Sequence, residues 1–483
     1  MMRSLYSGVS GLKVHQTKMD VIGNNISNVN TVGFKASQVN FSDILYQTTS
    51  SASGPNANTG RAGTNAKQIG LGASVAEITT TVAVSGGAQR TDNALDVMIE
   101  GEQYFIVNNG QQNLFTKAGA FKVDANGVLC NSSGCKVMGW QVDPNDENKT
   151  VPDRVSELRV MSPDNLYTPP EATTNTYMTG NIDYKDTQLQ TDTGKSTTMS
   201  FYDNLGQSYM AVMNIKQSEE NYNVYNVTIT DILDSQGNSI FVRKTVEDDG
   251  SITYSASDIT SFMWGAEGEE YTAEVDEEDG SVRIEMEGVP LTFSQETGKF
   301  VSVGANEENP NSVFFSVTGL DPSPFQTIDV DFSKMTMYAS SGSSSFANSR
   351  GSVDDPSKGT GKPQGNMTGI SVDTSGRIYG AYDNGDTMLL CQIAVASFAN
   401  AAGLEAAGNN LFRTTMNSGE FDGVGEDVTL AGGKMTTGVL EMSNVDLSSE
   451  FTQMITTQRG FQANSRIITV SDTLLEELIN LKR

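Results

Sequence analysis

Two heptad repeats, one near each end of the chain, constrain the fold most. Near the N-terminus, apolar residues recur every seven positions, with others at spacings of three and four: Leu5, Val9, Leu12, Met19, Ile22, Ile26 and Val29. Near the C-terminus the same spacing of seven residues separates the members of a second set: Met454, Phe461, Ile468 and Leu475. Phe451 and Ile479 flank this set. Such stripes are typical of helices that pack along a partner helix. The simplest arrangement pairs the two ends with each other.

The N-terminal helix is expected to be marginal by itself. Gly8, Gly11 and Gly23 each weaken a helix by about 1 kcal/mol relative to alanine. The C-terminal helix is expected over residues 447–481, with Asn444 or Asp446 as its N-cap. The middle of its stripe is polar, which suggests a face turned to water or to another subunit: Gln458, Ser465 and Asp472.

A run of asparagines follows the first heptad segment, in "NNISNVNTVGFKAS". Asparagine tolerates the left-handed backbone conformation that closes helices, and glycine offers a second such position. We therefore expect a helix stop and turn formed by Asn24, Asn25, Asn28, Asn30, Gly33 and Phe34.

Alternating apolar and polar residues fill the region between the two helices. Hairpin turns are expected at Asn109-Gly110 and Asn126-Gly127 in the first half, and at Ser375-Gly376 and Asn384-Gly385 in the return. The predicted fold is mostly β and multi-domain, with paired terminal helices that form a coiled-coil-like inner domain and with a nested insertion. The expected divisions are 1–30 with 447–483 (helices), 31–69 (linker and hairpin), 70–145 with 362–446 (inner β-domain) and 146–361 (inserted acidic outer β-domain or domains).

Composition argues against several classes of function. The net charge is −28, and no basic face is available for nucleic acid. The lone histidine, His15, lies on the first helix, so no catalytic triad, metal site or cofactor fingerprint is expected. Residues 276–287 resemble half of a calcium loop, but a solvated acidic hairpin within the acidic segment 247–287 is the simpler interpretation. Cys130 and Cys135 are expected as buried thiols or one hairpin disulfide.

The sequence contains no run of 18 apolar residues, so no membrane insertion is expected. The first twenty residues lack the apolar core of a secretory signal. Export would need a route that requires no cleaved signal.

Several segments resemble flagellar rod and hook proteins. "MDVIGNNISNVNTVGFKAS" is similar to their N-terminal signature, and the last 43 residues, from "EMSNVDLSSEF" onward, are similar to their C-terminal signature. "LDVMIEGEQYFIV" and "QIAVASFANAAGLEAAGNNLF" resemble the inner β-domain of hook subunits. The likeness covers roughly residues 1–145 and 360–483, and the large insertion favours the hook over the shorter rod proteins.

The resemblance implies a structural subunit with no enzymatic activity. It implies a helical homopolymer that forms the universal joint between rod and filament, with the terminal helices as its innermost layer. The implied partners are the distal rod protein, the hook cap, the hook–filament junction proteins and the flagellar type III export apparatus. The implied location is the extracellular hook, reached without signal cleavage. A distal rod subunit remains the alternative within the family, and a secreted acidic β-rich binding protein or adhesin the alternative outside it.

Overall fold

The computed structural model describes residues 2–55, 60, 62–143, 146–246, 252–266, 268–304, 310–318, 324–430 and 432–481. The chain divides into two compact units. Unit 1 comprises residues 1–166, 368–381 and 387–483, and unit 2 comprises residues 167–367 and 382–386. Each unit is described below by itself.

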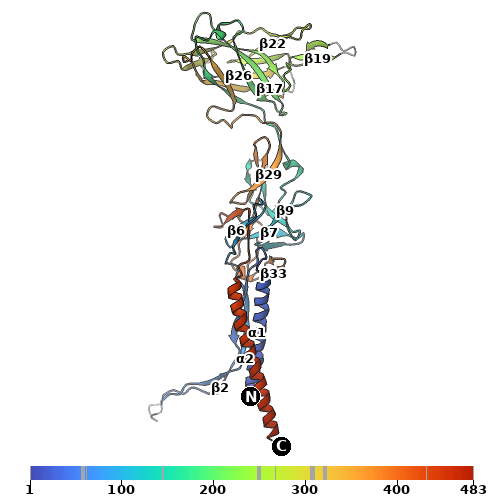
Figure 1. The fold of residues 1–483 in the computed structure, drawn as a ribbon, viewed down its shortest axis with the longest axis vertical. Coiled ribbons are helices and arrows are strands. Elements are labelled where there is room, and N and C mark those ends of the chain that lie inside the picture. Colours follow the sequence, from blue (N-terminus) through green and yellow to red (C-terminus); the bar gives the residue numbers. More distant parts are fainter. Residues whose placement is uncertain are drawn as a thin grey trace. The chain divides into compact units, whose positions relative to one another are not determined.

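Two long helices, α1 (Met2–Ser27) and α2 (Leu447–Asn480), lie side by side in unit 1 (Figure 1). They are antiparallel, because Ser4 meets Ser471 near one end (Oγ–Oγ 3.4 Å) and Asn25 meets Glu450 near the other. Asp446 caps α2 by accepting hydrogen bonds from the N–H groups of the next turn. The predicted mostly-β fold with paired terminal helices is confirmed.

Strands from before and after the insertion share the sheets of unit 1. Its main sheet has the order β30-β31-β11-β7-β8-β34-β33, so β11 pairs with β31 and β8 with β34. Smaller sheets repeat this, because β6 pairs with β35 and β5 with β36. The return segment therefore runs back along the outgoing one.

The strands of unit 1 that precede the insertion are β1 (Ser37–Asp43), β2 (Tyr46–Ser50), β3 (Lys67–Gly70), β4 (Ala73–Thr80), β5 (Ala88–Arg90), β6 (Val97–Glu100), β7 (Tyr104–Asn108), β8 (Asn113–Thr116), β9 (Phe121–Val123), β10 (Leu129–Asn131), β11 (Lys136–Asp143), β12 (Asp146–Thr150) and β13 (Ser156–Glu157).

The strands after the insertion complete these sheets. They are β30 (Arg377–Tyr382), β31 (Thr387–Ile393), β32 (Val395–Ala396), β33 (Glu405–Gly408), β34 (Leu411–Arg413), β35 (Lys434–Thr437) and β36 (Val439–Glu441), preceded by β29 (Gly365–Val372) at the border of the two units. The hairpin turns expected from Asn-Gly and Ser-Gly pairs are confirmed, since the glycines adopt positive φ at Gly110, Gly127, Gly376 and Gly385. The structure records Cys130 and Cys135 as free thiols, so the alternative of a hairpin disulfide is wrong; the prediction of buried thiols is confirmed for Cys135, whereas Cys130 is half-buried.

Unit 2 folds around one apolar core, and two sheets contribute side chains to it. The orders are β23-β22-β21-β26-β27-β15-β28 and β16-β17-β18-β24-β25, and β19 pairs with β20. Trp264, Phe262 and Phe315 from one sheet and Phe201 and Tyr225 from the other are fully buried together. The strands are β14 (Tyr167–Thr168), β15 (Asn175–Asn181), β16 (Lys195–Tyr202), β17 (Ser208–Gln217), β18 (Val224–Leu233), β19 (Val242–Val246), β20 (Ile252–Ala256), β21 (Ser261–Gly265), β22 (Glu269–Val275), β23 (Val282–Ile284), β24 (Val289–Phe293), β25 (Phe300–Val303), β26 (Ser312–Thr318), β27 (Ile328–Thr336) and β28 (Ser345–Arg350).

The acidic segment contains the hairpin of β22 and β23. Its turn is closed locally, because Asp276 accepts a hydrogen bond from the N–H of Glu278 (2.9 Å) and Gly280 adopts φ +73°. Residues 247–251 and 267 of that segment lie outside the described residues. Within the described ranges, no cluster of three His, Cys, Asp or Glu side chains is placed to hold a metal ion, and no helix is long and apolar enough to cross a membrane.

Replacing Phe315 with alanine should destabilise unit 2. The ring is fully buried against Phe201 at 5.3 Å between centroids, and such truncations cost about 3–5 kcal/mol. The chain has two tryptophans, so a Trp140→Phe background leaves Trp264 as a fluorescent reporter of unit 2 during urea unfolding. Val301→Ala, at a half-exposed position, should shift the transition by less than about 0.5 kcal/mol. Equal shifts for both variants would contradict the assignment of this core.

Candidate assembly surface

Glycines bring the two helices of unit 1 close together. A Cβ atom at Gly8 would lie 3.2 Å from Ile468, and one at Gly11 would lie 2.7 Å from the amide of Asn464. The sequence indicated only that these glycines weaken α1. Their position at the helix contact shows that they also permit a backbone approach that larger residues would block.

The lone histidine lies in the same helix contact. His15 packs against Gly460, where an added Cβ would lie 2.7 Å from the ring, and makes an edge-on contact with Phe41 at 6.0 Å between centroids. Burial, and then the neighbouring charge of Lys18, lowers the pKa of His15. The neutral ring therefore serves as a packing group between α1, α2 and β1.

The predicted heptad residues occupy three different environments. Ile22 is buried in the unit. Val9, Phe451 and Ile479 are exposed. The remaining ones are half-buried: Leu5, Leu12, Met19, Ile26, Val29, Met454, Phe461, Ile468 and Leu475. Val29 lies in the turn after α1, so its assignment to the helical stripe is wrong.

A second apolar face of α2 points to solvent, and most of it was not predicted. Its members form two separate patches, and all are more than a third exposed: Leu447, Phe451 and Ile455 near the start of α2, and Ile467, Val470, Leu474, Leu478 and Leu481 on one face toward its end. Among the polar residues predicted on the stripe, Gln458 and Asp472 are exposed and Ser465 is half-buried. The second patch, residues 467–481, is an exposed apolar face on a long helix, which marks an interaction surface.

The helix stop works differently from the prediction. Among the described residues outside glycine, positive φ occurs at four positions, and none of them belongs to the asparagine run. Gly33 supplies the left-handed residue, at φ +70°. Left-handed asparagines are therefore not the reason why α1 ends at Ser27.

Hydrogen bonds of the asparagine side chains hold the turn. Asn25 is buried, and its side chain forms two hydrogen bonds with the backbone of Ser37: it donates to the carbonyl (2.8 Å) and accepts from the N–H (3.0 Å). Asn28 donates to the carbonyl of Asn24 (2.9 Å) and accepts from the hydroxyl of Thr31. The two other members of the predicted motif make no such clamp: Asn30 is exposed and Phe34 is half-buried.

Asn444 provides a matching clamp from the other end of the chain. Its side chain accepts from the N–H of Ala36 (2.8 Å) and donates to the carbonyls of Thr81 (2.9 Å) and Val84 (3.0 Å). Of the two N-caps proposed for α2, Asp446 is confirmed, and Asn444 instead ties the segment before α2 to the segment after α1.

A buried ion pair lies at the same junction. Lys35 Nζ is 2.6 Å from Glu441 Oε1, and the two side chains are 1% and 0% exposed. Lys35 also donates to the carbonyl of Val84 (2.8 Å), and Glu441 accepts from the N–H of Gly86 (3.0 Å). Because removing charges from water is costly, these extra hydrogen bonds are what make the pair tolerable.

A second buried lysine stands beside this pair. Lys117 donates to the carbonyl of Gly101 (2.6 Å) and lies over the ring of Tyr104 at 5.1 Å. Burial lowers the pKa of Lys117 to about 8, although Glu441 acts to raise it. Neither lysine was predicted from the sequence, because Glu441 is 406 positions from Lys35 and the burial of Lys117 appears only in the folded chain.

Four family models match successive parts of the chain. They are described as Flagella basal body rod protein (residues 5–35), Flagellar hook protein FlgE/F/G D1 domain (98–164), Flagellar basal body protein FlaE D2 domain (170–351) and Flagellar basal body rod FlgEFG protein C-terminal (436–481). The flagellar hook protein FlgE of Borreliella burgdorferi is 34% identical over 491 residues, which cover 100% of both chains. The chain belongs to the flagellar hook protein family.

Other relatives agree with this placement. The hook protein FlgE of Treponema pallidum is 33% identical, again over 100% of both chains. The rod protein FlgG of Bacillus subtilis is also similar across 100% of both chains, at the lower identity of 28%. The hook interpretation is thus favoured over the distal rod alternative.

A matched pair of glycine substitutions tests the helix stop. Gly33→Ala should destabilise unit 1 by more than about 1 kcal/mol, because the residue has φ +70° and a Cβ would lie 2.7 Å from the backbone of Ala118. Gly23→Ala should stabilise by about 1 kcal/mol, since no atom of another element lies within 4 Å of its Cβ position in α1. Thermal unfolding measures both; a stabilised Gly33→Ala protein would refute the role given to Gly33.

Breaking the buried ion pair should be costly. Lys35→Met leaves Glu441 buried and uncompensated, which should reduce the free energy of unfolding by about 3–5 kcal/mol. The exposed pair of Arg90 and Asp92 is the control, and Arg90→Met should cost less than about 1 kcal/mol. In Lys35→Met with Glu441→Met, part of the loss should be recovered; additive losses would show that the pair is not coupled.

Proposed function

We propose that this chain assembles with copies of itself into the flagellar hook, the flexible tube that couples the basal-body rod to the filament. The single observation that supports assembly is the exposed apolar face of α2 over residues 467–481. Water contact along such a row is unfavourable by about 25 cal/mol per Å² of apolar surface, so a neighbouring copy that covers it gains stability. The similar proteins of Borreliella burgdorferi and Treponema pallidum are named as flagellar hook proteins, which agrees with this role.

The α1–α2 pair forms the inner layer of the proposed tube, as the predicted interface residues imply. One side of each helix is used inside the subunit, and the exposed side of α2 contacts adjacent subunits. The acidic residues of unit 2 suit a surface turned to water, because unpaired buried carboxylates are costly. The predicted division into nested domains is part of this proposal.

The finer partners follow from the same proposal. The polymer contacts the distal rod protein at its base and the hook cap and the hook–filament junction proteins at its growing end. Subunits travel through the flagellar export apparatus without cleavage of a signal and become extracellular. The protein acts as structural material, with no reaction or cofactor assigned to it.

A charge placed on the apolar face of α2 should prevent assembly. Val470 is 57% exposed, so Val470→Asp should leave the monomer folded but put a carboxylate in the contact between copies. Thr469→Asp, one position away on the polar side of α2, adds the same charge and should still assemble. Circular dichroism checks the fold, and electron microscopy of basal bodies checks the polymer.

The two structural roles give different images. A hook subunit predicts basal bodies that carry complete rods without hooks in the Val470→Asp strain. A rod subunit predicts basal bodies without the distal rod. Normal hooks in that strain would overturn the proposed assembly surface.

A further inference from the structure

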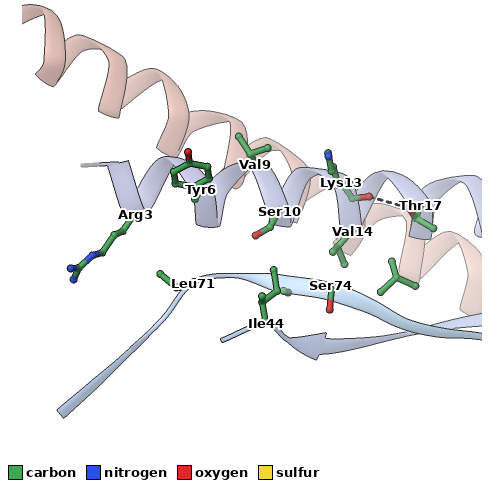
Figure 2. Close-up of a pocket in the computed structure, with 12 residues that line it drawn as sticks. Arg3, Tyr6, Val9, Ser10, Lys13, Val14, Thr17, Ile44, Leu71 and Ser74 are labelled. Atoms are coloured by element: carbon green, nitrogen blue, oxygen red, sulfur yellow. Dashed lines mark hydrogen bonds between the residues drawn. The ribbon is translucent and has the colours of Figure 1, made fainter. Parts of the chain in front are cut away.

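An open apolar groove of about 570 Å³ runs between α1 and the β1–β4 pair. In Figure 2, Ser10 and Val14 reach from α1 toward Ile44, Leu71 and Ser74 on the opposite wall. Tyr6, Val9 and Ile44 line this groove and are 43–67% exposed. The groove therefore presents apolar side chains that this chain leaves uncovered.

Two positive charges border the groove. Arg3 and Lys13 line it and are exposed. Neither forms a salt bridge within the described part of the chain. An occupant that fits must be apolar on one face and acidic beside it.

Residues 474–481, at the end of α2, have this chemistry. Because Ser471 lies opposite Ser4, the last turns of α2 extend past the described start of α1 (Figure 1). Leu474, Leu478 and Leu481 form one face of this overhang, residues 474–481, at 46%, 48% and 83% exposure. Glu477 follows Leu474 by three positions and precedes Leu481 by four, so it borders that face. It forms no salt bridge among the described residues.

Leu478 of the overhang cannot reach Ile44 in the groove of its own chain. Ile44 donates its N–H to Gly72, and Gly72 packs against Ser10, more than a turn beyond Ser4 along α1. Leu478 lies two turns beyond Ser471 in the other direction, which places it roughly 20 Å from Ile44 along the helix axis. A contact between Leu478 and Ile44 therefore requires another copy.

The geometry points to a donor–acceptor contact between copies: the overhang of one chain docks in the α1/β1–β4 groove of the next, with Glu477 beside Lys13 or Arg3. This inference rests on the proposed function and specifies one of its contacts. The contact is head-to-tail, so each copy offers one overhang and one groove, which suits continued addition rather than closure into a symmetric dimer.

Disulfide trapping in assembled hooks tests the contact. Cells that co-express Ile44→Cys and Leu478→Cys chains should yield hooks whose subunits shift from monomer to dimer on oxidation. Each variant expressed alone should stay monomeric on the same gel, as should wild-type hooks with the three native cysteines. Ile455→Cys, exposed on α2 outside the overhang, is the matched control for Leu478→Cys and should give no dimer with Ile44→Cys.

The outcomes separate this contact from the proposed function. Hooks that form without the mixed dimer, or in which Ile44→Cys couples to a different polypeptide or stays open to a thiol reagent, would overturn the inference while leaving hook assembly intact. If the cysteine variants fail to assemble, reciprocal charge reversal decides the matter. Lys13→Glu and Glu477→Lys should each reduce swimming, and the double variant should recover it; two fully motile single variants would overturn the contact.

Discussion

The buried pair of Lys35 and Glu441 is the interaction on which the rest of unit 1 depends. Lys35 follows the turn after α1, and Glu441 is the last residue of β36, shortly before α2. One ion pair therefore connects the segment after the end of α1 to the segment before the start of α2. Each charge would be unfavourable alone at this depth, and each is held by further backbone hydrogen bonds. The helices can pair along their lengths because their bases are fixed here, in the same junction as the Asn25 and Asn444 clamps.

Such an anchor permits a helix pair that is weak by its own composition. Gly8, Gly11 and Gly460 lie in the contact, and glycines lower helix stability. A contact built from leucines would make the helix pair stable without a neighbour, and it would bury the apolar side chains of α2 between the two helices. Here small and polar residues occupy the contact, so much of the apolar surface of α2 stays outside. The helix pair is thereby less stable within one subunit, and the apolar surface of α2 remains available for contact with neighbouring subunits.

The heptad spacing predicted both helices and their pairing, because a period near 3.5 follows from the sequence alone. It did not predict which face each helix would use. The contact runs through Ser4, Gly8, Gly11 and His15, residues that a search for apolar stripes passes over. The Asn-Gly turns were found because their conformational demand is local. Lys35 and Glu441 were not, since they are separated by 406 positions and only the folded chain shows that they meet.

The arrangement also explains why asparagine stands at Asn25 near the end of α1 and at Asn444 before α2. A chain that leaves a helix and enters a strand must satisfy its backbone groups during the change of direction. Asn25 does so for Ser37 from inside α1, and Asn444 does so for Ala36 from beside α2, each with a donor and an acceptor on one short side chain. Aspartate there would lack the donor, and leucine would leave both backbone groups without a partner. Asn25 and Asn444 therefore meet a hydrogen-bonding requirement of the junction, and they hold the start of α2 at a fixed orientation to β1 and β4.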